Sequence, residues 1–335
     1  MTSAIEAVTR IPRDSHPVSR KNISDNALKV MSRLRSQGYQ GYLVGGAVRD
    51  LLLGGRPKDF DIATDATPEE VHSLFRNSRL IGRRFRIVHV QFGREIIEVT
   101  TFRGHHDNED DRPQKQAKQS DEGVLLRDNV YGSLEEDAAR RDFTVNALYY
   151  SSDDFTVFDF VEGLKDLEQK QICIIGDPEK RYREDPVRML RAIRFAAKLD
   201  FSIEEKTAAP IPELAYLLEA IPAARLFDEM LKLFMAGNAQ RTFALLSEYR
   251  LLEHLFPPTA TAIEEMEYAE ALIDAAMAST DSRIAEGKPV TPAFILAALL
   301  WPPTVQLARQ LEDEGEAPMS AMGEAAQTII GEQIH

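Results

Sequence analysis

Two aspartates separated by one residue, Asp59 and Asp61, are the first side chains in this sequence that could do chemistry together. They begin the segment "DFDIAT", which we expect to be a short strand. Because side chains alternate between the two faces of a strand, both carboxylates would point the same way and repel each other. A hard divalent cation such as Mg²⁺ relieves this repulsion, with phosphate oxygens completing its coordination. The alternative interpretation of such a pair is a solvated turn.

The segment before these aspartates has the features of a phosphate-binding turn. Gly45 and Gly46 follow the short apolar strand "GYLV" and let backbone N–H groups approach a phosphate closely. A short helix is expected in "AVRDLLLG", where its first turn adds partial positive charge and Arg49 can reach a phosphate oxygen. Each feature alone is a weak signal. In this order and within a short distance, they indicate a site where two metal ions activate a hydroxyl and stabilise a leaving phosphate.

A third carboxylate would complete such a two-metal site, and the sequence offers two candidates. Glu98 lies on a predicted strand, where its alternative role is that of an exposed strand residue. Asp142 follows two arginines and could instead hold one of them in a salt bridge. The residues themselves leave both candidates open.

A second constellation lies further along the chain, in "REDPVRMLRAIRF". Asp185 precedes a proline and could simply cap the helix that follows, where Arg188 and Arg191 occupy neighbouring positions. A carboxylate beside a guanidinium also matches the amino donor and ring-nitrogen acceptor on the pairing edge of adenine or cytosine. Guanine and uracil present the reverse pattern, and a buried mismatch costs roughly 1–3 kcal/mol. The pair by itself does not separate ATP from CTP.

The elements that must position these residues change character near residue 176. We expect an irregular arm over residues 1–22, a mixed α/β head over residues 23–176, and an all-helical neck and body over residues 177–335. In the head, capped helices are predicted after Thr67 and Ser133, the second continuing through "RRDFTVNALYY", and two strands are predicted on either side of Gly93. Residues 104–123 are expected to be a mobile loop, and no strand is expected after residue 176. The weak periodicity of the last thirty residues suggests that the chain is cut short.

Composition limits the class of protein. The chain has 335 residues, 44% hydrophobic and 28% charged, which is ordinary for a soluble protein of two or three domains. One cysteine, no signal-peptide pattern and no long apolar run lead us to expect a cytoplasmic protein. The net charge of −14 argues against a general nucleic-acid coat protein, although five arginines gather between Arg76 and Arg86.

Four segments together resemble the ordered motifs of one enzyme family: "LVGGAVRDLLLG", "KDFDIAT", "RRDFTVNALYY" and "EDPVRMLRAIRFAAKL". They are similar to those of class II template-independent nucleotidyltransferases, a group that contains bacterial poly(A) polymerases and tRNA CCA-adding enzymes. The resemblance runs from about residue 12 to about residue 257. Within the group, the segments around "GRRFRIVHV" and "LLRDNVYGSLEEDAARRDF" look like the poly(A) polymerase branch.

The resemblance implies a polymerase-beta-like nucleotidyltransferase head, in an α+β fold with a mixed sheet. It implies Mg²⁺, with two ions, ATP as donor, an RNA 3′ end as acceptor and pyrophosphate as product. Asp59 and Asp61 would be metal ligands and Asp142 the third active-site acid. The residues expected to hold the nucleotide are Gly45, Gly46, Arg49, Arg141, Asp185, Arg188 and Arg191.

We therefore expect a polynucleotide adenylyltransferase that acts in RNA polyadenylation. The alternatives are CCA addition to tRNA and an RNA- or nucleotide-binding protein that has lost catalysis. The intact pair of aspartates argues against the last, since an inactive protein has no use for two repelling carboxylates. Partners in RNA degradation are compatible with this function, but no segment identifies them. Such polymerases typically end in an Arg/Lys-rich extension, whereas this sequence ends in an acidic region, so we expect a weak grip on RNA.

Overall fold

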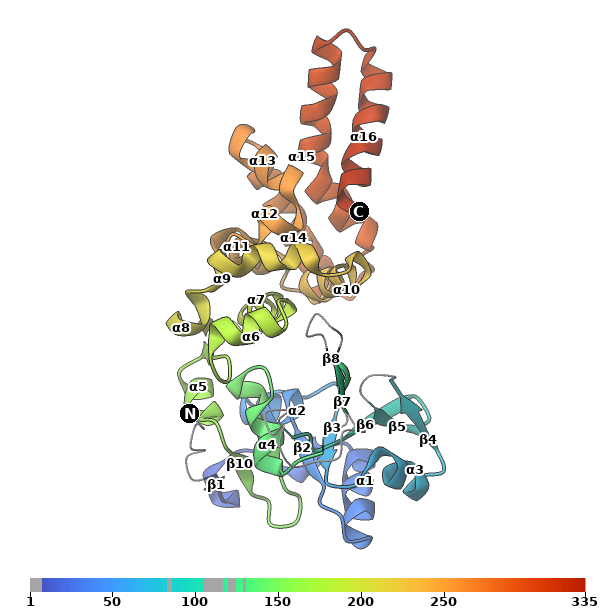
Figure 1. The fold of residues 1–335 in the computed structure, drawn as a ribbon, viewed down its shortest axis with the longest axis vertical. Helices are drawn as coiled ribbons and strands as arrows, with labels where there is room; N and C mark the ends of the chain where they lie inside the picture. Colours follow the sequence, from blue (N-terminus) through green and yellow to red (C-terminus); the bar gives the residue numbers. More distant parts are fainter. Residues whose placement is uncertain (1–7, 83–85, 105–116, 120–124, 129–130, 335) are drawn as a thin grey trace. The chain divides into compact units, whose positions relative to one another are not determined.

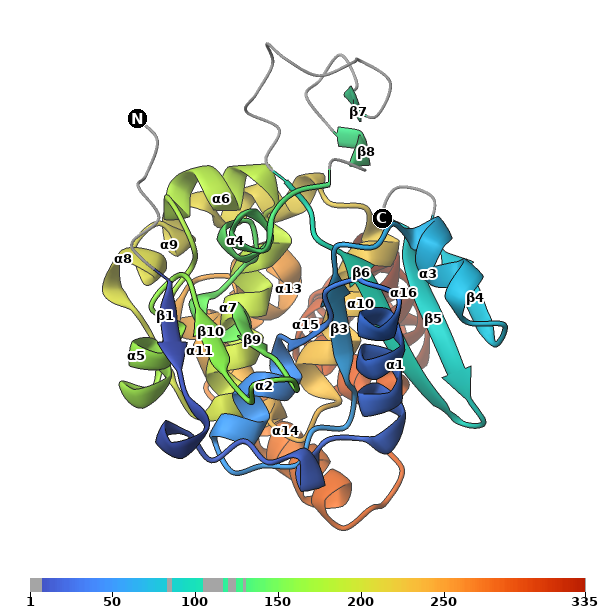
Figure 2. The ribbon, with the colours of Figure 1, turned by 90° about the horizontal axis from the view of Figure 1, so that it is seen from below.

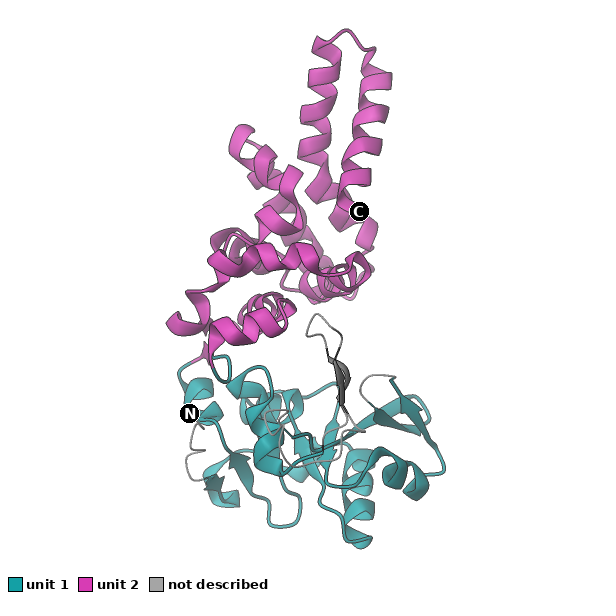
Figure 3. Cartoon of the chain, in the orientation of Figure 1, with its two compact units in different colours: residues 1–169, 173–176 teal, residues 170–172, 177–335 magenta. Residues whose placement is uncertain are grey.

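The computed structural model describes residues 8–82, 86–104, 117–119, 125–128 and 131–334 (Figure 1). The chain divides into two compact units, one of residues 1–169 and 173–176 and the other of residues 170–172 and 177–335 (Figure 3). The first unit holds a large mixed sheet and the second is mainly helical, as the sequence predicts. Among the described helices, none is long and apolar enough to cross a membrane.

An eight-stranded sheet forms the centre of the first unit. One pair, β3 with β6, is parallel, and all other neighbouring strands in this sheet are antiparallel. From one edge to the other, the strands are β1 (Thr9–Ile11), β10 (Val157–Asp159), β9 (Leu148–Tyr150), β2 (Tyr42–Val44), β3 (Asp61–Thr64), β6 (Glu95–Thr101), β5 (Ile87–Phe92) and β4 (Ser78–Ile81).

The hairpin of β5 and β6 shows why these residues form strands. Val88 and Val90 on β5 and Ile97 and Val99 on β6 are buried, and more exposed residues separate them, so the alternation matches the two faces of the sheet. Gly93 makes the turn with a φ of +62°, which glycine adopts without steric cost. This hairpin and its turn are confirmed as predicted.

Short helices cover the sheet. They are α1 (Asp25–Ser36), α2 (Gly46–Leu52), α3 (Pro68–Leu74), α4 (Leu134–Ala139) and α5 (Gly163–Glu168). The predicted capping boxes are both present, at the start of α3 with Thr67 and Glu70 and at the start of α4 with Ser133 and Glu136. Helix α1 packs against β2, β3 and β6 (Figure 2).

Three sequence predictions for the first unit need correction. The segment expected as an irregular arm contributes the edge strand β1 and two 3-10 turns, η1 (Arg13–Ser15) and η2 (Arg20–Asn22). The helix that starts after Ser133 ends at Ala139, and the apolar residues that follow form a 3-10 turn, η3 (Thr144–Asn146), and the buried strand β9. Most of the loop predicted over residues 104–123 lies outside the described residues, but within it β7 (Ala117–Gln119) pairs in an antiparallel way with β8 (Leu125–Asp128), which follows the predicted loop.

The second unit is built from helices that bury one apolar face each. In chain order they are α6 (Pro178–Glu184), α7 (Val187–Leu199), α8 (Glu205–Ala208), α9 (Ile211–Leu214), η4 (Ala215–Ala220), α10 (Ala223–Phe234), α11 (Ala239–Glu248), α12 (Leu252–Leu255), α13 (Pro257–Glu265), α14 (Ala269–Ala285), α15 (Pro292–Asp313) and α16 (Pro318–Ile334). The prediction that no strand follows residue 176 is wrong in one place. Strand β12 (Ser202–Ile203) pairs in parallel with β11 (Gln171–Ile172).

Candidate nucleotide and metal site

The glycine pair joins β2 to α2 between two guanidinium groups. Gly45 has a φ of +73° and lies just before α2. A Cβ atom added to Gly45 would come 3.7 Å from Nη1 of Arg141, and one added to Gly46 would come 3.3 Å from Nη2 of Arg49. Any larger residue at position 46 would therefore press on Arg49. The predicted turn exists, and the guanidinium groups of Arg49 and Arg141 lie beside it.

The two predicted metal ligands are arranged differently from the prediction. Asp61 is the first residue of β3, whereas Asp59 precedes the strand and is exposed, and Phe60 between them is buried. The prediction that both aspartates lie within the strand is therefore wrong for Asp59, and a shared face for the two carboxylates stays a prediction. The expected repulsion is present, because the Asp59 charge contributes to raising the pKa of Asp61.

Glu98 lies directly opposite Asp61 on the neighbouring parallel strand. Burial is the largest cause that raises the pKa of Asp61 to about 6, and the Glu98 and Asp59 charges add to it, while the Arg141 guanidinium opposes it. On the other side of Glu98, His89 of β5 is its cross-strand partner, with 3.6 Å between Nε2 and Oε2. The charges of Glu98 and Asp59 thus both act on Asp61, and carboxylate oxygens are ligands that a hard divalent cation prefers.

Asp142, the other candidate for the third carboxylate, is used differently. Its Oδ1 accepts a hydrogen bond from the backbone N–H of Phe143 at 2.8 Å and lies 3.5 Å from Nδ2 of Asn146. Across the described part of the chain, no group of three or more His, Cys, Asp or Glu side chains is arranged to hold a metal ion by itself. An ion beside Asp61 would need oxygen ligands from a substrate.

Arg141 links the glycine turn to the aspartates. Its Nη1 lies against Gly45, and its charge lowers the pKa of Asp61. Asp137, one helical turn earlier, accepts from Nη2 at 3.1 Å. The guanidinium is therefore positioned where phosphate oxygens held near the turn would meet it.

Arg49 lies deeper than predicted. It is 2% exposed, its Nε and Nη2 donate to Asp50 Oδ1 at 2.8 and 2.6 Å, and its Nη1 donates to Asn146 Oδ1 at 2.5 Å. The sequence predicts a side chain that reaches a phosphate from the first turn of the helix. In the structure, the same guanidinium lies against Gly46 and is hydrogen-bonded to Asp50 and Asn146.

In the second unit, Asp185 and Arg188, the two residues predicted to recognise the base together, each contact other residues. Asp185 accepts from the backbone N–H of Val187 at 3.3 Å, and both of its carboxylate oxygens lie 2.9 Å from Nη2 of Arg225 on α10. Arg188 donates from Nη1 to the backbone oxygen of Arg181 at 2.7 Å and to Glu184 at 3.0 Å. The contact of Asp185 with Val187, the first residue of α7, is present, and Arg225 is the ion-pair partner of Asp185.

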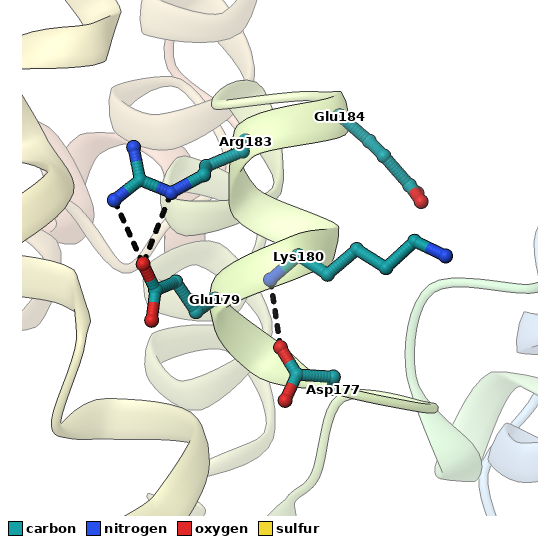
Figure 4. Close-up of a pocket in the computed structure, with 5 residues that line it drawn as sticks. All are labelled: Asp177, Glu179, Lys180, Arg183 and Glu184. Carbon is teal, nitrogen blue, oxygen red and sulfur yellow. Dashed lines mark hydrogen bonds and ion pairs between the residues drawn. The ribbon is translucent and has the colours of Figure 1, made fainter. Parts of the chain in front are cut away.

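The third predicted residue of this group, Arg191, lies on α7 with its guanidinium 5.5 Å from the centre of the Phe195 ring. A shallow depression on the neighbouring helix α6 is lined by five charged residues: Asp177, Glu179, Lys180, Arg183 and Glu184 (Figure 4). There, Arg183 donates twice to Glu179 and Asp177 caps the helix at Lys180 N. This depression contains none of the predicted site residues.

The arginine-rich segment is described only in part. Arg79 is an exposed residue of β4, and Arg86 pairs with Glu69 of α3. Arg83 and Arg84 lie outside the described residues. Whether this segment contacts RNA therefore stays a prediction.

Two family models match the chain. The "Poly A polymerase head domain" covers residues 41–173, and the "Probable RNA and SrmB- binding site of polymerase A" covers residues 200–263. The chain is 54% identical over 329 residues to a protein of Salmonella typhimurium named "Poly(A) polymerase I", covering 97% of this chain and 70% of that protein. A protein of the same name from Escherichia coli O6:H1 is 57% identical over 310 residues, covering 92% of this chain and 66% of its own length.

The chain belongs to the poly(A) polymerase family. It spans about two thirds of the length of these relatives. The fold agrees with a solved structure of a CCA-adding enzyme from Bacillus stearothermophilus in complex with CTP, with a TM-score of 0.57 and 27% identity over 91% of this chain and 82% of that one. The much higher identity to poly(A) polymerases confirms that this branch is the closer one and that the CCA-adding branch is the alternative.

For this poly(A) polymerase family member, sequence reasoning missed several residues of the site. Asn146 and Tyr149 lie in "RRDFTVNALYY" and His89 lies in "GRRFRIVHV", but neither segment indicated a role for them, and only the fold brings them to Arg49, Arg141 and Glu98. Arg225 lies 40 residues from Asp185 in sequence. One signal was present: Asp137 and Arg141 are four residues apart, a spacing that places them side by side on a helix.

Proposed function

We propose that this chain is a polynucleotide adenylyltransferase that adds AMP from ATP to RNA 3′ ends and releases pyrophosphate. The observation that carries the proposal is the charge cluster beside the glycine turn, in which Asp61 has a pKa of about 6 next to Glu98, Asp59 and Arg141. Its membership of the poly(A) polymerase family supports ATP and RNA as the substrates. These substrates fit a cytoplasmic enzyme.

We propose Asp59, Asp61 and Glu98 as the residues that hold Mg²⁺. Burial and the neighbouring Glu98 and Asp59 charges raise the pKa of Asp61, and a divalent cation would favour its charged form. When bound, Mg²⁺ makes the attacking hydroxyl more acidic and neutralises charge on the departing pyrophosphate. We propose that Asp142 stabilises the chain turn before η3 through its hydrogen bond from the backbone N–H of Phe143. Contact with a metal ion would be an additional role of Asp142.

The protein's own groups then align the reactants. The glycine turn admits the triphosphate close to the backbone, and Arg141 meets its oxygens at the edge nearest Asp61. Arg49 keeps the turn in place through Asn146 and Asp50. The new bond joins the RNA 3′ oxygen to the α-phosphorus as the bond to pyrophosphate breaks, and the hydroxyl proton passes to solvent.

Nucleotide choice is assigned to Asp185 and Arg188, with Arg191 on the same helix as a further nucleotide contact. Asp185 accepts from the adenine amino group, and Arg188 donates to the neighbouring ring nitrogen. Asp185 is ion-paired with Arg225 and Arg188 with Glu184, so a base that contacts both residues would replace these partners.

The test is to offer ATP, CTP, GTP and UTP separately, each with Mg²⁺, to an unstructured RNA and to a tRNA that lacks its CCA end. We expect ATP to extend both RNAs by many residues. Addition of only C-C-A to the tRNA, with no extension of the unstructured RNA, would move the chain to the CCA-adding branch. Binding of ATP without any transfer would instead mark a protein that has lost catalysis.

A further inference from the structure

A buried three-residue network holds Arg141 from the side away from the glycine turn. The Tyr149 hydroxyl accepts a hydrogen bond from Nε of Arg141 at 2.8 Å and donates one to Oδ2 of Asp137 at 2.7 Å. Asp137 Oδ2 in turn accepts from Nη2 of the same guanidinium at 3.1 Å. Tyr149 is 0% exposed and Asp137 is 4% exposed, so water does not compete for the bond between them.

The protonation states that this network needs are secured by its surroundings. Burial raises the pKa of Tyr149, so the hydroxyl keeps the proton that it donates. Burial by itself also raises the pKa of Asp137, but the Arg141 and Arg140 guanidinium groups outweigh it and hold that pKa below its usual range. A charged Asp137 therefore faces a neutral Tyr149, with Arg141 bonded to both.

Two bonds on one edge of a planar guanidinium fix both its position and its plane. Here the fixed edge is Nε and Nη2, and the opposite nitrogen, Nη1, lies against Gly45. We propose that Asp137 and Tyr149 are positioning residues that aim Arg141 at the triphosphate of the incoming nucleotide. This inference rests on the proposed function, because it names how one of that site's own groups is oriented.

The matched pair of variants is Tyr149→Phe and Tyr150→Phe. Both remove one hydroxyl from neighbouring buried tyrosines, but among the described residues the Tyr150 hydroxyl has no hydrogen-bond partner. ATP binding is measured by calorimetry with Mg²⁺ and without RNA, so that no transfer is required. We expect the Kd for ATP to rise about tenfold in Tyr149→Phe, which equals about 1.4 kcal/mol, and less than twofold in Tyr150→Phe.

A double-mutant cycle with Arg141→Lys separates positioning from general damage. If Tyr149 acts through Arg141, Tyr149→Phe changes the Kd less than twofold when Arg141 is already lysine. An equal loss in both backgrounds, or no loss in the native background, overturns the proposal. Near-UV circular dichroism checks that each variant is folded, and if Tyr149→Phe is not, the same cycle is run with Asp137→Asn.

The same data distinguish this inference from the proposed function. Polyadenylation assays on the native chain test the function, whereas the cycle tests only how ATP is held. Suppose that the native chain binds ATP normally and transfers no AMP, while the cycle still shows coupling between Tyr149 and Arg141. That result would refute the adenylyltransferase assignment but support Asp137 and Tyr149 as positioning residues.

Discussion

Asp61 and Glu98 lie opposite each other on the parallel pair of strands β3 and β6, and each is enclosed by a further partner in the same row across the sheet. On the far side of Asp61 is the buried Val44 of β2, and on the far side of Glu98 is His89 of β5. Cross-strand partners share one face of a sheet, so the two carboxylates approach each other beside an apolar neighbour. This arrangement explains why one of them is difficult to ionise.

Replacing Asp61 by asparagine should separate activity from stability. The amide keeps the size of the side chain but removes one charge from a repelling cluster, so AMP transfer with Mg²⁺ should fall to background. The melting temperature of the metal-free protein at pH 7.5 should stay the same or rise. Activity near the native level would refute the assigned metal role. Asp313→Asn, at an exposed aspartate on α15, is the control and should change neither quantity.

The stability of the metal-free protein should depend on pH through Asp61. Its pKa is raised from 3.8 to about 6 on folding, so the stability due to the protonated carboxyl is complete below about pH 3.8 and is lost as pH rises through about 6. The stabilisation gained from Asp61→Asn should therefore be about 1–2 kcal/mol smaller at pH 5 than at pH 7.5. Urea unfolding of both proteins at the two pH values measures this, and an equal gain at both would show that the carboxyl is not strained.

Substitutions of Glu98 and of Asp142 should change the Mg²⁺ dependence of the transfer rate by different amounts. Glu98 faces Asp61, whereas Asp142 bonds to the backbone N–H of Phe143. Glu98→Gln should raise the Mg²⁺ concentration needed for half-maximal rate several-fold and lower the maximal rate. Asp142→Asn should shift that concentration by less than twofold. Magnesium titrations of the transfer rate decide between them, and the reverse pattern would make Asp142 the third ligand.

Loss of Asp185 and Arg188 should change the preference between nucleotides more than it lowers the rate with ATP. With both Asp185 and Arg188 replaced by alanine, the preference for ATP over GTP should fall about tenfold, because a mismatched buried polar group costs roughly 1–3 kcal/mol. Competition between the two nucleotides measures the preference. A lower melting temperature with an unchanged preference would leave Asp185 only its capping contact with Val187.

Arg225→Gln is the companion variant for this test. Arg225 donates to the Asp185 carboxylate, so replacing Arg225 removes this ion pair and leaves the carboxylate in place. The ATP preference should persist in Arg225→Gln while it falls in the alanine pair. A parallel fall in both would show that the ion pair, and not Asp185 itself, is needed for discrimination.

The sequence predicts the parts of this site that are local. The glycine pair, Asp59 and Asp61 lie within one short segment, and the capping boxes of α3 and α4 need only residues three apart. The β5 and β6 hairpin follows from alternation around a single glycine. These signals act over a few residues, so one sequence is enough to find them.

What the sequence could not predict depends on long-range pairing. Glu98 becomes a neighbour of Asp61 only because β3 and β6 pair in parallel, and Arg225 reaches Asp185 across 40 residues. Strand β9 was missed because all of its residues are buried, so it lacks the alternation that identifies a half-exposed strand. Strand β3 begins only at Asp61, so Asp59 lies just outside the expected strand, next to the buried Phe60.

The most direct test of the account uses ATP labelled at the α-phosphate, Mg²⁺ and an RNA with a free 3′ hydroxyl, with parallel measurement of AMP incorporated and pyrophosphate released. For the native chain we predict one pyrophosphate for each AMP added, and no product when the RNA 3′ hydroxyl is absent. Asp61→Asn should give neither product. Equal AMP incorporation by the native chain and by Asp61→Asn, or none by the native chain, would contradict the central claim that adenylyl transfer takes place at the carboxylates beside the glycine turn.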